Sequence, residues 1–359
     1  MKIFRYLKRK PLALLLIALP LAIMAKVFSW GDLWIFILAA VGVIPMASYI
    51  GEATEALASY TGPKIGGLLN ATLGNAAELI ITLVAIKAGL LDLVKASITG
   101  SIIGNLLLVL GLAMVVGGAK HGVQTFDRRQ AGNNSILLIL AVVALVIPSF
   151  FSHSIGPETS VGVEAFSIGV AVVMIVLYGL GVFYTIKFNN SPLAYTPTTV
   201  EHAKPHWTVA FSLVVLALAT VGVVVLSELL VGAVEVVVVE LGLSEFFLGI
   251  ILIPIVGNVA EHIVAVQVAA RNQMDLSVEI AVSSSLQIAL LVAPVLVFVS
   301  LAMGNPLTLV FNAFELAALG AGILIVALVS ADGESNWLEG AALLAVYLIL
   351  GIAFFMLPA

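Results

Sequence analysis

The chain consists of long apolar segments joined by short polar ones. Of its 359 residues, 62% are hydrophobic and only 10% are charged, whereas soluble domains carry about 25% charged residues. An apolar run of about 20 residues crosses the core of a bilayer as a helix, and these runs do not alternate as the strands of a membrane barrel do. The sequence therefore predicts an all-α polytopic membrane protein. Eleven transmembrane helices are expected, at residues 11–28, 33–58, 67–88, 93–118, 132–150, 161–186, 207–234, 246–270, 277–303, 308–330 and 337–357.

The distribution of Lys and Arg predicts how these helices are oriented. If the N-terminus lies in the cytoplasm, twelve of the fifteen basic residues fall on the cytoplasmic side, and only Lys26, Lys87 and Lys95 fall outside. Such an excess of basic residues marks the cytoplasmic side of a membrane protein. We therefore expect a cytoplasmic N-terminus and a C-terminus outside.

An N-terminal segment and a central polar connection divide the chain. Residues 1–30 combine a basic start with the first apolar span, and no small-residue cleavage site precedes Lys26, which favours a retained transmembrane helix over a signal peptide. Residues 189–206 are the longest polar connection and are expected to form a cytoplasmic loop. The other spans form two groups of five, at residues 31–188 and 207–359.

One short phrase occurs once in each group of five spans. It reads Gly-Asn-Ala-Ala-Glu at residues 74–78 and Gly-Asn-Val-Ala-Glu at residues 257–261. Because each group has an odd number of spans, the two groups insert into the membrane in opposite orientations. The sequence therefore predicts one N-terminal helix followed by two inverted five-helix repeats.

Each copy of the phrase puts a carboxylate inside an apolar span. An ionised carboxylate alone in hydrocarbon is very costly, so Glu78 and Glu261 each need a proton, a partner or a metal ion. Asn75 and Asn258 stand three residues before these glutamates and share a helix face with them. Two carboxylates and two amide oxygens form the hard oxygen shell that Ca²⁺ prefers. We expect these four side chains to bind one cation at a site shared by the two repeats.

Further small and polar residues are expected to line this site. Glycine begins both phrases, and glycine in a membrane helix can free backbone carbonyls toward a cavity. A second matched segment, rich in serine, follows each glutamate, and the interval from glutamate to serine is the same in both copies. Ordinary hydrogen bonding between membrane helices would also explain its serine and amide side chains. The residues expected to line the site are Gly74, Gly257, Ser101, Ser284, Asn105 and Gln287.

These segments resemble the cation/calcium exchanger superfamily, and its proton/calcium antiporter branch in particular. The resemblance is carried by the stretches GNAAELIITLVAIKAG, GSIIGNLLLVLG, GNVAEHIVAVQVAARNQMD and SSSLQIALLVAP. It implies that Glu78 and Glu261 bind Ca²⁺ and exchange it for protons in a secondary active, alternating-access cycle. Ser283 stands where that family usually has Gly, and the acidic regulatory stretch of some members is missing from the central loop. The neighbours that the resemblance implies around the ion are Asn75, Asn258, Ser101, Ser284 and Gln287.

Other ionisable residues flank the predicted site. Glu52 and Glu55 lie near the inner end of the second span, and Glu228 and Glu235 lie toward the outer end of the seventh. They could attract cations to the two mouths of a pathway, or they could be interfacial carboxylates in water. His262 directly follows the second motif glutamate and points about 100° away from it. A proton relay and a hydrogen bond to a neighbouring helix are both compatible with it.

Two other functions compete with proton/calcium antiport. A sodium/calcium exchanger would also use central carboxylates, but that branch has Ser and Pro before the acid where both copies here have Asn and Ala. A passive cation channel rarely needs two inverted halves with helix breaks at mid-membrane. An enzyme is not expected, because the His-Glu-x-x-His motif of metalloproteases is absent.

The expected partners follow from the same features. There is no basic patch with interleaved aromatics, which argues against nucleic acid. The chain has no cysteine and therefore no disulfide or thiolate metal site. No cofactor is expected; the partners are the transported calcium ion, protons and the lipid bilayer, in the plasma membrane of the cell. A homo-oligomer is compatible with the sequence.

Overall fold

The structure, a computed structural model, describes residues 11–187 and 207–357. The expected basic N-terminus and the expected loop at residues 189–206 lie outside the described residues. In chain order the elements are η1 (Pro11–Ile17), α2 (Ala18–Val27), α3 (Asp32–Leu73), α4 (Ala76–Ala88), α5 (Leu91–Ile103), η2 (Gly104–Val109), α6 (Leu110–His121), β1 (Gln124–Thr125), α7 (Arg128–Ile155), α8 (Val161–Lys187), α9 (Val209–Gly232), α10 (Val234–Leu241), α11 (Glu245–Phe247), η3 (Leu248–Leu252), α12 (Ile253–Ala269), α13 (Met274–Gln287), η4 (Ile288–Val292), α14 (Ala293–Met303), α15 (Ala313–Val329), β2 (Glu334–Ser335) and α16 (Trp337–Phe355).

Within the described residues, eight helical segments are long and apolar enough to cross a membrane. Two shorter apolar helices, Leu12–Val27 and Ala313–Val329, accompany them. The chain is therefore an integral membrane protein built of helices. The eight segments are Asp32–Thr61, Leu91–His121, Arg128–Ile155, Val161–Tyr184, Val209–Gly232, Glu245–Ala269, Met274–Met303 and Trp337–Phe355.

Helix α3 differs from the expected pair of spans at residues 33–58 and 67–88, because helical backbone continues from Asp32 to Leu73. It is nevertheless not straight. A Cβ on Gly66 would lie 2.7 Å from the carbonyl oxygen of Ala58, whereas eight residues span about 12 Å along a straight helix. The chain thus bends sharply between Ala58 and Gly66, and only glycine fits so close to another backbone. The hydroxyl of Thr61 donates to the Ala58 carbonyl at 3.0 Å and helps to satisfy it at the bend.

The loops gather at two opposite ends of the bundle. We call the first the Arg128 end, where three connections meet: the loop after α6, the loop after α12 and the loop after α15. Lys120 Nζ donates to the Ala270 carbonyl at 2.9 Å, the backbone N–H of Asp127 donates to Asp275 Oδ1 at 2.6 Å, and β1 pairs antiparallel with β2. Exposed basic side chains at this end of the described residues include Lys120, Arg128, Arg129 and Arg271.

We call the opposite end the Glu158 end. Here the loop between α7 and α8 meets the start of α5 and the loop between α14 and α15. Lys95 pairs with Glu158 at 3.1 Å, and Thr308 Oγ1 donates to the same carboxylate at 2.5 Å. Asn305 Nδ2 donates to the carbonyl of Ile86, near the end of α4, at 2.8 Å. Helices between these ends alternate in direction, so α5 starts at the Glu158 end and α13 starts at the Arg128 end.

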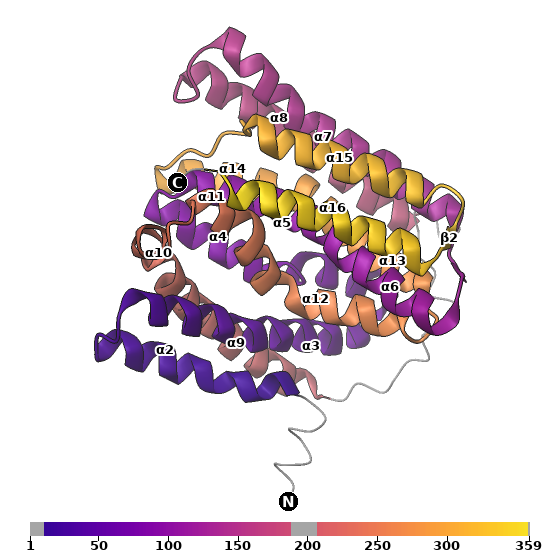
Figure 1. The fold of residues 1–359 in the computed structure, drawn as a ribbon, viewed down its shortest axis with the longest axis horizontal. Coiled ribbons are helices and arrows are strands. Elements are labelled where there is room, and N and C mark those ends of the chain that lie inside the picture. Colours follow the sequence, from indigo (N-terminus) through magenta and orange to yellow (C-terminus); the bar gives the residue numbers. More distant parts are fainter. Residues whose placement is uncertain (1–10, 188–206, 358–359) are drawn as a thin grey trace, which may run out of the picture.

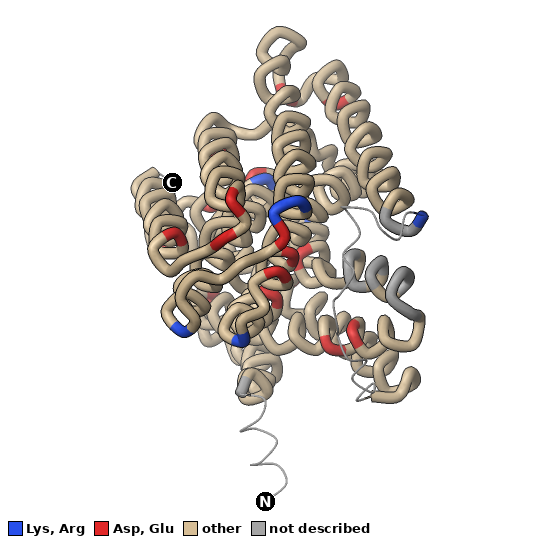
Figure 2. Tube along the Cα trace, turned by 90° about the vertical axis from the view of Figure 1, so that its right-hand side faces the viewer, with Lys and Arg blue, Asp and Glu red and all other residues tan. Residues whose placement is uncertain are grey.

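The helices form three layers (Figure 1). Helices α2, α3 and α9 lie at the bottom of the view, α7, α8 and α15 lie at the top, and α4, α5, α6, α12 and α13 lie between them. Figure 2, a view onto the Arg128 end, shows that charged residues are few along the helices, most of which are drawn as uncharged. The central layer is shielded from lipid, and every residue of α5 from Leu93 to Ile103 is buried. A polar site inside this layer is thus kept away from hydrocarbon.

Two π-helical segments occupy matching places in the central layer. The segment η2 joins α5 to α6, and η4 joins α13 to α14. The shift along the sequence that takes Glu78 to Glu261 also takes Val109, the last residue of η2, to Val292, the last residue of η4. A π-helical turn inside an α-helix is rare and frequently marks a functional site.

Close backbone packing holds the central helices together. A Cβ on Gly100 of α5 would lie 2.1 Å from the carbonyl oxygen of Ile250 in η3. No side chain fits in that space, so glycine is required where these two backbones touch. Such contacts through small residues are a main source of attraction between helices in a membrane. Gly100 thereby fixes the position of its neighbour Ser101.

Candidate functional site

The first motif lies at a helix break. Helix α3 ends at Leu73, and α4 begins at Ala76, so Gly74 and Asn75 connect the two. Asn75 occupies the N-cap position, yet its side chain makes no capping hydrogen bond. Its Nδ2 instead donates to Gln287 Oε1 at 2.9 Å. An amide side chain that would ordinarily cap a helix is thus turned toward the second half of the chain.

Glu78 stands in the first turn of α4 and is only 1% exposed. Its Oε1 accepts a hydrogen bond from Ser101 Oγ. Within the described residues, no hydrogen-bond partner reaches its buried Oε2, and no Lys or Arg forms an ion pair with it. The positive end of the α4 dipole favours negative charge here, but one buried oxygen is left free for a proton or a cation.

Glu261 repeats this arrangement in the second half. It lies in α12, is partly buried, and its Oε2 accepts a hydrogen bond from Ser284 Oγ at 2.7 Å. Each motif glutamate is therefore bonded to the serine of the matched segment that follows it in its own half of the chain. The equal interval in the sequence corresponds to an equivalent contact in space.

Amide side chains link the two halves across the site. Asn258 Nδ2 donates to Ser101 Oγ at 3.2 Å, and Asn105 Nδ2 donates to Ser284 Oγ at 3.0 Å. In addition, Ser284 Oγ lies 3.3 Å from Asn75 Oδ1. Each serine thus touches the glutamate of its own half and the asparagine of the other half.

The backbone of the second motif also contacts the first. A Cβ on Gly257 would lie 3.7 Å from Glu78 Cβ and 3.8 Å from its Cα. Gly257 lies inside the continuous helix α12, so the second motif has no counterpart of the break at Gly74. It is instead preceded by the π-helical η3, with Pro254 in the first turn of α12. The first motif is therefore preceded by a helix break, and the second by a π-helical segment and a proline.

The resulting site offers two carboxylates together with amide and hydroxyl oxygens. Gly257, which packs against Glu78, stands about one helical turn before Glu261, so the two carboxylates belong to one region of the bundle. Among the described residues there is no group of three His, Cys, Asp or Glu side chains that could hold a metal ion, so neutral oxygens would have to complete a cation's shell. Carboxylate, amide and carbonyl oxygens suit a hard divalent cation such as Ca²⁺.

The residues considered for access to the site lie in varied surroundings. Glu52 is partly buried and Glu55 is exposed, and both precede the bend of α3. Glu235 is exposed at the start of α10. Glu228 forms an ion pair with Lys87 at 3.9 Å near the Glu158 end, with both side chains more than half exposed, and such exposed pairs contribute little to stability.

His262 is partly buried next to the second motif glutamate. In the part of the chain that the structure describes, its ring forms no hydrogen bond. The alternative in which His262 bonds to a neighbouring helix therefore finds no support among these residues.

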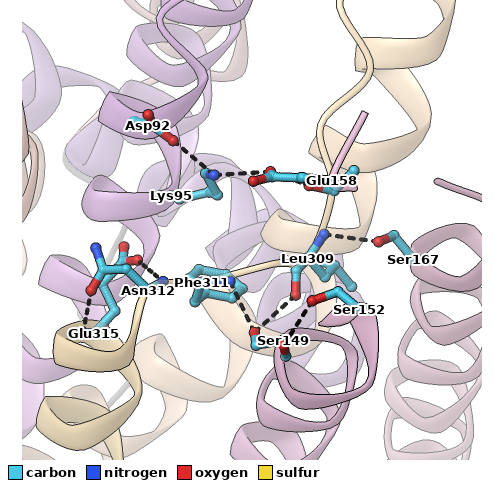
Figure 3. Close-up of polar contacts among 11 residues, drawn as sticks. Asp92, Lys95, Ser149, Ser152, Glu158, Ser167, Leu309, Phe311, Asn312 and Glu315 are labelled. Carbon is cyan, nitrogen blue, oxygen red and sulfur yellow. Dashed lines mark hydrogen bonds and ion pairs between the residues drawn. The ribbon is translucent and has the colours of Figure 1, made fainter. Parts of the chain in front are cut away.

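A buried polar cluster near the Glu158 end was not anticipated from the sequence (Figure 3). Lys95, expected only as a basic residue on the outer side, is 7% exposed and pairs with Asp92 at 2.7 Å and with Glu158 at 3.1 Å. Two acidic partners compensate the cost of burying its ammonium group. The spacing of Asp92 and Lys95, three residues apart on a helix, was the available signal.

Glu315 adds a second buried carboxylate to this region. It is 2% exposed, and its Oε2 accepts from the backbone N–H of Asn312, which completes a capping box at the start of α15. Its Oε1 lies 3.4 Å from Thr99 Oγ1 of α5. Thr99 is two residues from Ser101, so these side chains point to nearly opposite faces of α5. The cluster therefore supports α5 from behind the central site.

The chain is similar in sequence and in overall structure to membrane exchangers. The family model described as "Sodium/calcium exchanger protein" matches residues 31–187 and 211–356. The chain is 44% identical over 363 residues to the Ca(2+)/H(+) antiporter of Aphanothece halophytica, with 96% of each chain covered. It is 45% identical over 343 residues to the Ca(2+)/H(+) antiporter ChaA of Bacillus subtilis (strain 168), which covers 94% of this chain and 96% of that one. The solved structure of native YfkE superposes with a TM-score of 0.85 at 42% identity, covering 96% of this chain and 100% of that one.

Proposed function

Because this chain belongs to the sodium/calcium exchanger protein family, we propose that it is a secondary active antiporter that exchanges Ca²⁺ for protons. The relatives that it matches over nearly its full length are named Ca(2+)/H(+) antiporters. The observation that carries the proposal is the state of Glu78, a buried carboxylate with one oxygen held by Ser101 and the other without a partner among the described residues. A buried carboxylate needs a proton or a cation, and an antiporter supplies these in turn.

Competition at the two motif glutamates would couple the two fluxes. When no cation lies between two close carboxylates, they cannot both remain ionised, and protons neutralise them. Ca²⁺ displaces these protons because it binds the ionised carboxylates, and protons arriving from the other side displace Ca²⁺. Asn75, Asn258 and Ser284 supply neutral oxygens around the ion. One carboxylate pair therefore serves both substrates, and no cofactor is needed.

The proposal includes a membrane topology. We place the N-terminus in the cytoplasm and the C-terminus outside the plasma membrane, with eleven spans arranged as one helix and two inverted repeats at residues 31–188 and 207–359. The opposite directions of α5 and α13 and the matching positions of η2 and η4 support this arrangement. So does the gathering of exposed Lys and Arg at the Arg128 end, which would face the cytoplasm.

Sodium/calcium exchange is the second candidate, because the matching family model carries that description. The residues that precede the two acids, Asn and Ala in both copies, favour protons. A passive channel would carry Ca²⁺ down its gradient without any counter-ion. The three functions differ in which ion gradient drives Ca²⁺ uphill.

Transport by purified protein in proteoliposomes tests the proposal directly. We expect an imposed pH gradient to drive Ca²⁺ accumulation, a protonophore to abolish it, and a Na⁺ gradient of the same size to have no effect. Glu78→Gln protein, reconstituted at the same density, is the control for leakage. Ca²⁺ accumulation that follows the Na⁺ gradient and ignores the pH gradient would replace proton exchange by sodium exchange.

A further inference from the structure

Polar side chains recur at every fourth residue along α13. They are Asp275, Glu279, Ser283 and Gln287, and this spacing keeps neighbouring members on one side of the helix. The stripe begins at the Arg128 end, where Asp275 accepts a hydrogen bond from the backbone of Asp127. It ends about 18 Å further along the helix at Gln287, which accepts from Asn75 of the central site. The stripe therefore connects one end of the bundle with the site.

Glu279 is the carboxylate inside this stripe, and it is held in a defined orientation. Its Oε2 accepts from Gln130 Nε2 at 2.6 Å and from Asn134 Nδ2 at 3.2 Å, both on α7 and one turn apart. Among the described residues, no donor bonds its Oε1 and no basic side chain forms an ion pair with it. Glu279 is partly buried, so this oxygen is not sealed in the core. Two neutral amides thus orient the carboxylate and leave its charge uncompensated.

The carboxylate is not a requirement of the repeated fold. The shift along the sequence that relates the two motif glutamates takes Glu279 back to Ala96 of α5. Ala96 is fully buried. The same shift takes Ser283 and Gln287 to Gly100 and Gly104, and only Asp275 has a polar counterpart, Asp92. Of the two matched helices, only α13, which starts at the Arg128 end, carries an acid at this position.

The exposed charges at the Arg128 end are of both signs. Asp127, Asp275, Asp332 and Glu334 lie beside Lys120, Arg128, Arg129 and Arg271, so these surface charges largely offset one another. A carboxylate between this end and the site raises the local cation concentration. A single carboxylate with amide and water neighbours provides few of the six to eight oxygens that Ca²⁺ takes, so it binds the ion weakly and releases it readily.

We infer that Glu279 is an access ligand, which binds Ca²⁺ transiently between the Arg128 end and the central site. The inference rests on the proposed function for the identity of the ion. It assigns Glu279 a role in recruiting the cation, separate from the exchange step at Glu78 and Glu261. The other acid in the stripe, Asp275, accepts a hydrogen bond from the backbone N–H of Asp127, in the loop before α7.

Glu279→Gln separates this role from a structural one. Glutamine keeps a carbonyl oxygen that can accept both amide hydrogen bonds, so the packing of α13 on α7 survives while the charge is lost. Transport is measured in two vesicle preparations, one with the Arg128 end facing outward and one with it facing inward. When Ca²⁺ is supplied to the Arg128 end, we expect the KM for Ca²⁺ to rise about fivefold at low salt. When Ca²⁺ is supplied to the opposite end, we expect the KM to stay unchanged. The kcat at saturating Ca²⁺ should change less than about twofold, because the central site is intact. At about 1 M salt, where the screening length is about 3 Å, the difference in KM should shrink.

Glu339→Gln is the matched control. Glu339 lies at the same end of the bundle, at the start of α16, where its side chain accepts from the backbone N–H of Asn336 in a capping box. Glutamine preserves that hydrogen bond, and the variant removes the same charge away from the stripe. We expect its KM and kcat to equal those of the wild type.

A binding measurement tests the inference without transport. Protein with Glu78→Gln and Glu261→Gln together should retain weak Ca²⁺ binding, with a Kd of about 1 mM, and adding Glu279→Gln should remove it. If Glu279→Gln leaves both this binding and the KM unchanged while the wild type transports Ca²⁺, the access ligand is refuted. A lowered kcat with an altered pH profile and an unchanged KM would assign Glu279 to proton transfer and would also refute it. Failure of the wild type to transport Ca²⁺ against a pH gradient would instead count against the proposed function, and the binding result would still decide the access ligand.

Discussion

Asn75 donates a hydrogen bond of 2.9 Å to Gln287, a residue 212 positions further along the chain. The bond joins the break that begins α4 to the last residue of α13. It makes the first motif and the second serine segment parts of a single site. Any movement of α13 relative to α4 must break or rearrange this contact.

The two asparagines should contribute less to Ca²⁺ binding than the glutamates do. In Asn75→Ala and Asn258→Ala, the site loses a neutral oxygen and a hydrogen bond to its neighbour. Interactions with an ionised group are roughly twice as strong as those with a neutral one. We therefore expect a higher KM for Ca²⁺ with measurable remaining exchange. A loss of exchange as complete as that in the Glu→Gln variants would contradict this ranking.

Glu78 and Glu261 should each be indispensable. Glu→Gln retains the shape of the side chain but removes both the charge and the titration on which exchange depends. We expect each variant to keep less than a tenth of the wild-type transport rate, a loss above about 1.4 kcal/mol of barrier. Size-exclusion elution of the variants should match that of the wild type. A variant that is well folded and still transports above that level would show that the ion is held elsewhere.

Exchange should depend on pH through competition at the site. A carboxylate must be deprotonated to bind a metal ion, so each proton taken up as the pH falls removes a site for Ca²⁺. Lowering the pH on the side that supplies Ca²⁺ should raise the KM for Ca²⁺ and leave the maximal rate at saturating Ca²⁺ nearly unchanged. Initial rates measured over a matrix of pH and Ca²⁺ concentrations would reveal this. A KM that stays constant over that matrix would exclude competition.

The contact between α5 and η3 should tolerate no side chain at Gly100. The Cβ of Gly100→Ala would lie 2.1 Å from the Ile250 carbonyl oxygen, so the two backbones must separate. Forced overpacking costs about 1–3 kcal/mol, and we expect a lower thermal unfolding temperature in detergent together with reduced transport. Gly104→Ala is the matched control, because a Cβ on Gly104 would meet no atom within 4 Å. Equal unfolding temperatures for the two variants would refute the packing argument.

A cycle with two carboxylates should be insensitive to voltage. Two protons and one Ca²⁺ give the pair the same net charge, so their exchange moves no charge across the membrane. Any uncompensated charge would couple to about 2.3 kcal/mol per 100 mV. Clamping the potential of proteoliposomes with K⁺ and valinomycin, at a fixed pH gradient, should leave the Ca²⁺ flux unchanged. A flux that reverses with potential would require a third proton, and neutralising His262, Glu52, Glu55, Glu228 and Glu235 in turn would then locate its carrier.

Much of the membrane architecture is readable from the chain because it follows from local chemistry. The apolar runs are long enough to span a bilayer, and a backbone in hydrocarbon must satisfy its hydrogen bonds internally. A carboxylate in such a run must also find a partner, which draws attention to Glu78 and Glu261 before any contact is known. The repeated interval between each glutamate and its serine is likewise visible in the sequence. Both serines do bond to these glutamates in the structure.

Which groups meet across the chain depends on the tertiary structure. The contacts of Ser101 with Asn258, of Lys95 with Glu158 and of Glu279 with α7 each join residues that are distant in the sequence. Helical periodicity indicates which face of a helix a residue occupies, but it does not indicate which other helix packs against that face. Helical periodicity likewise does not indicate the sharp bend in α3, where Gly66 meets Ala58, or the π-helical segments. The sequence by itself therefore determines the membrane spans and shows which buried acids need partners. The packing of the helices decides which residues those partners are.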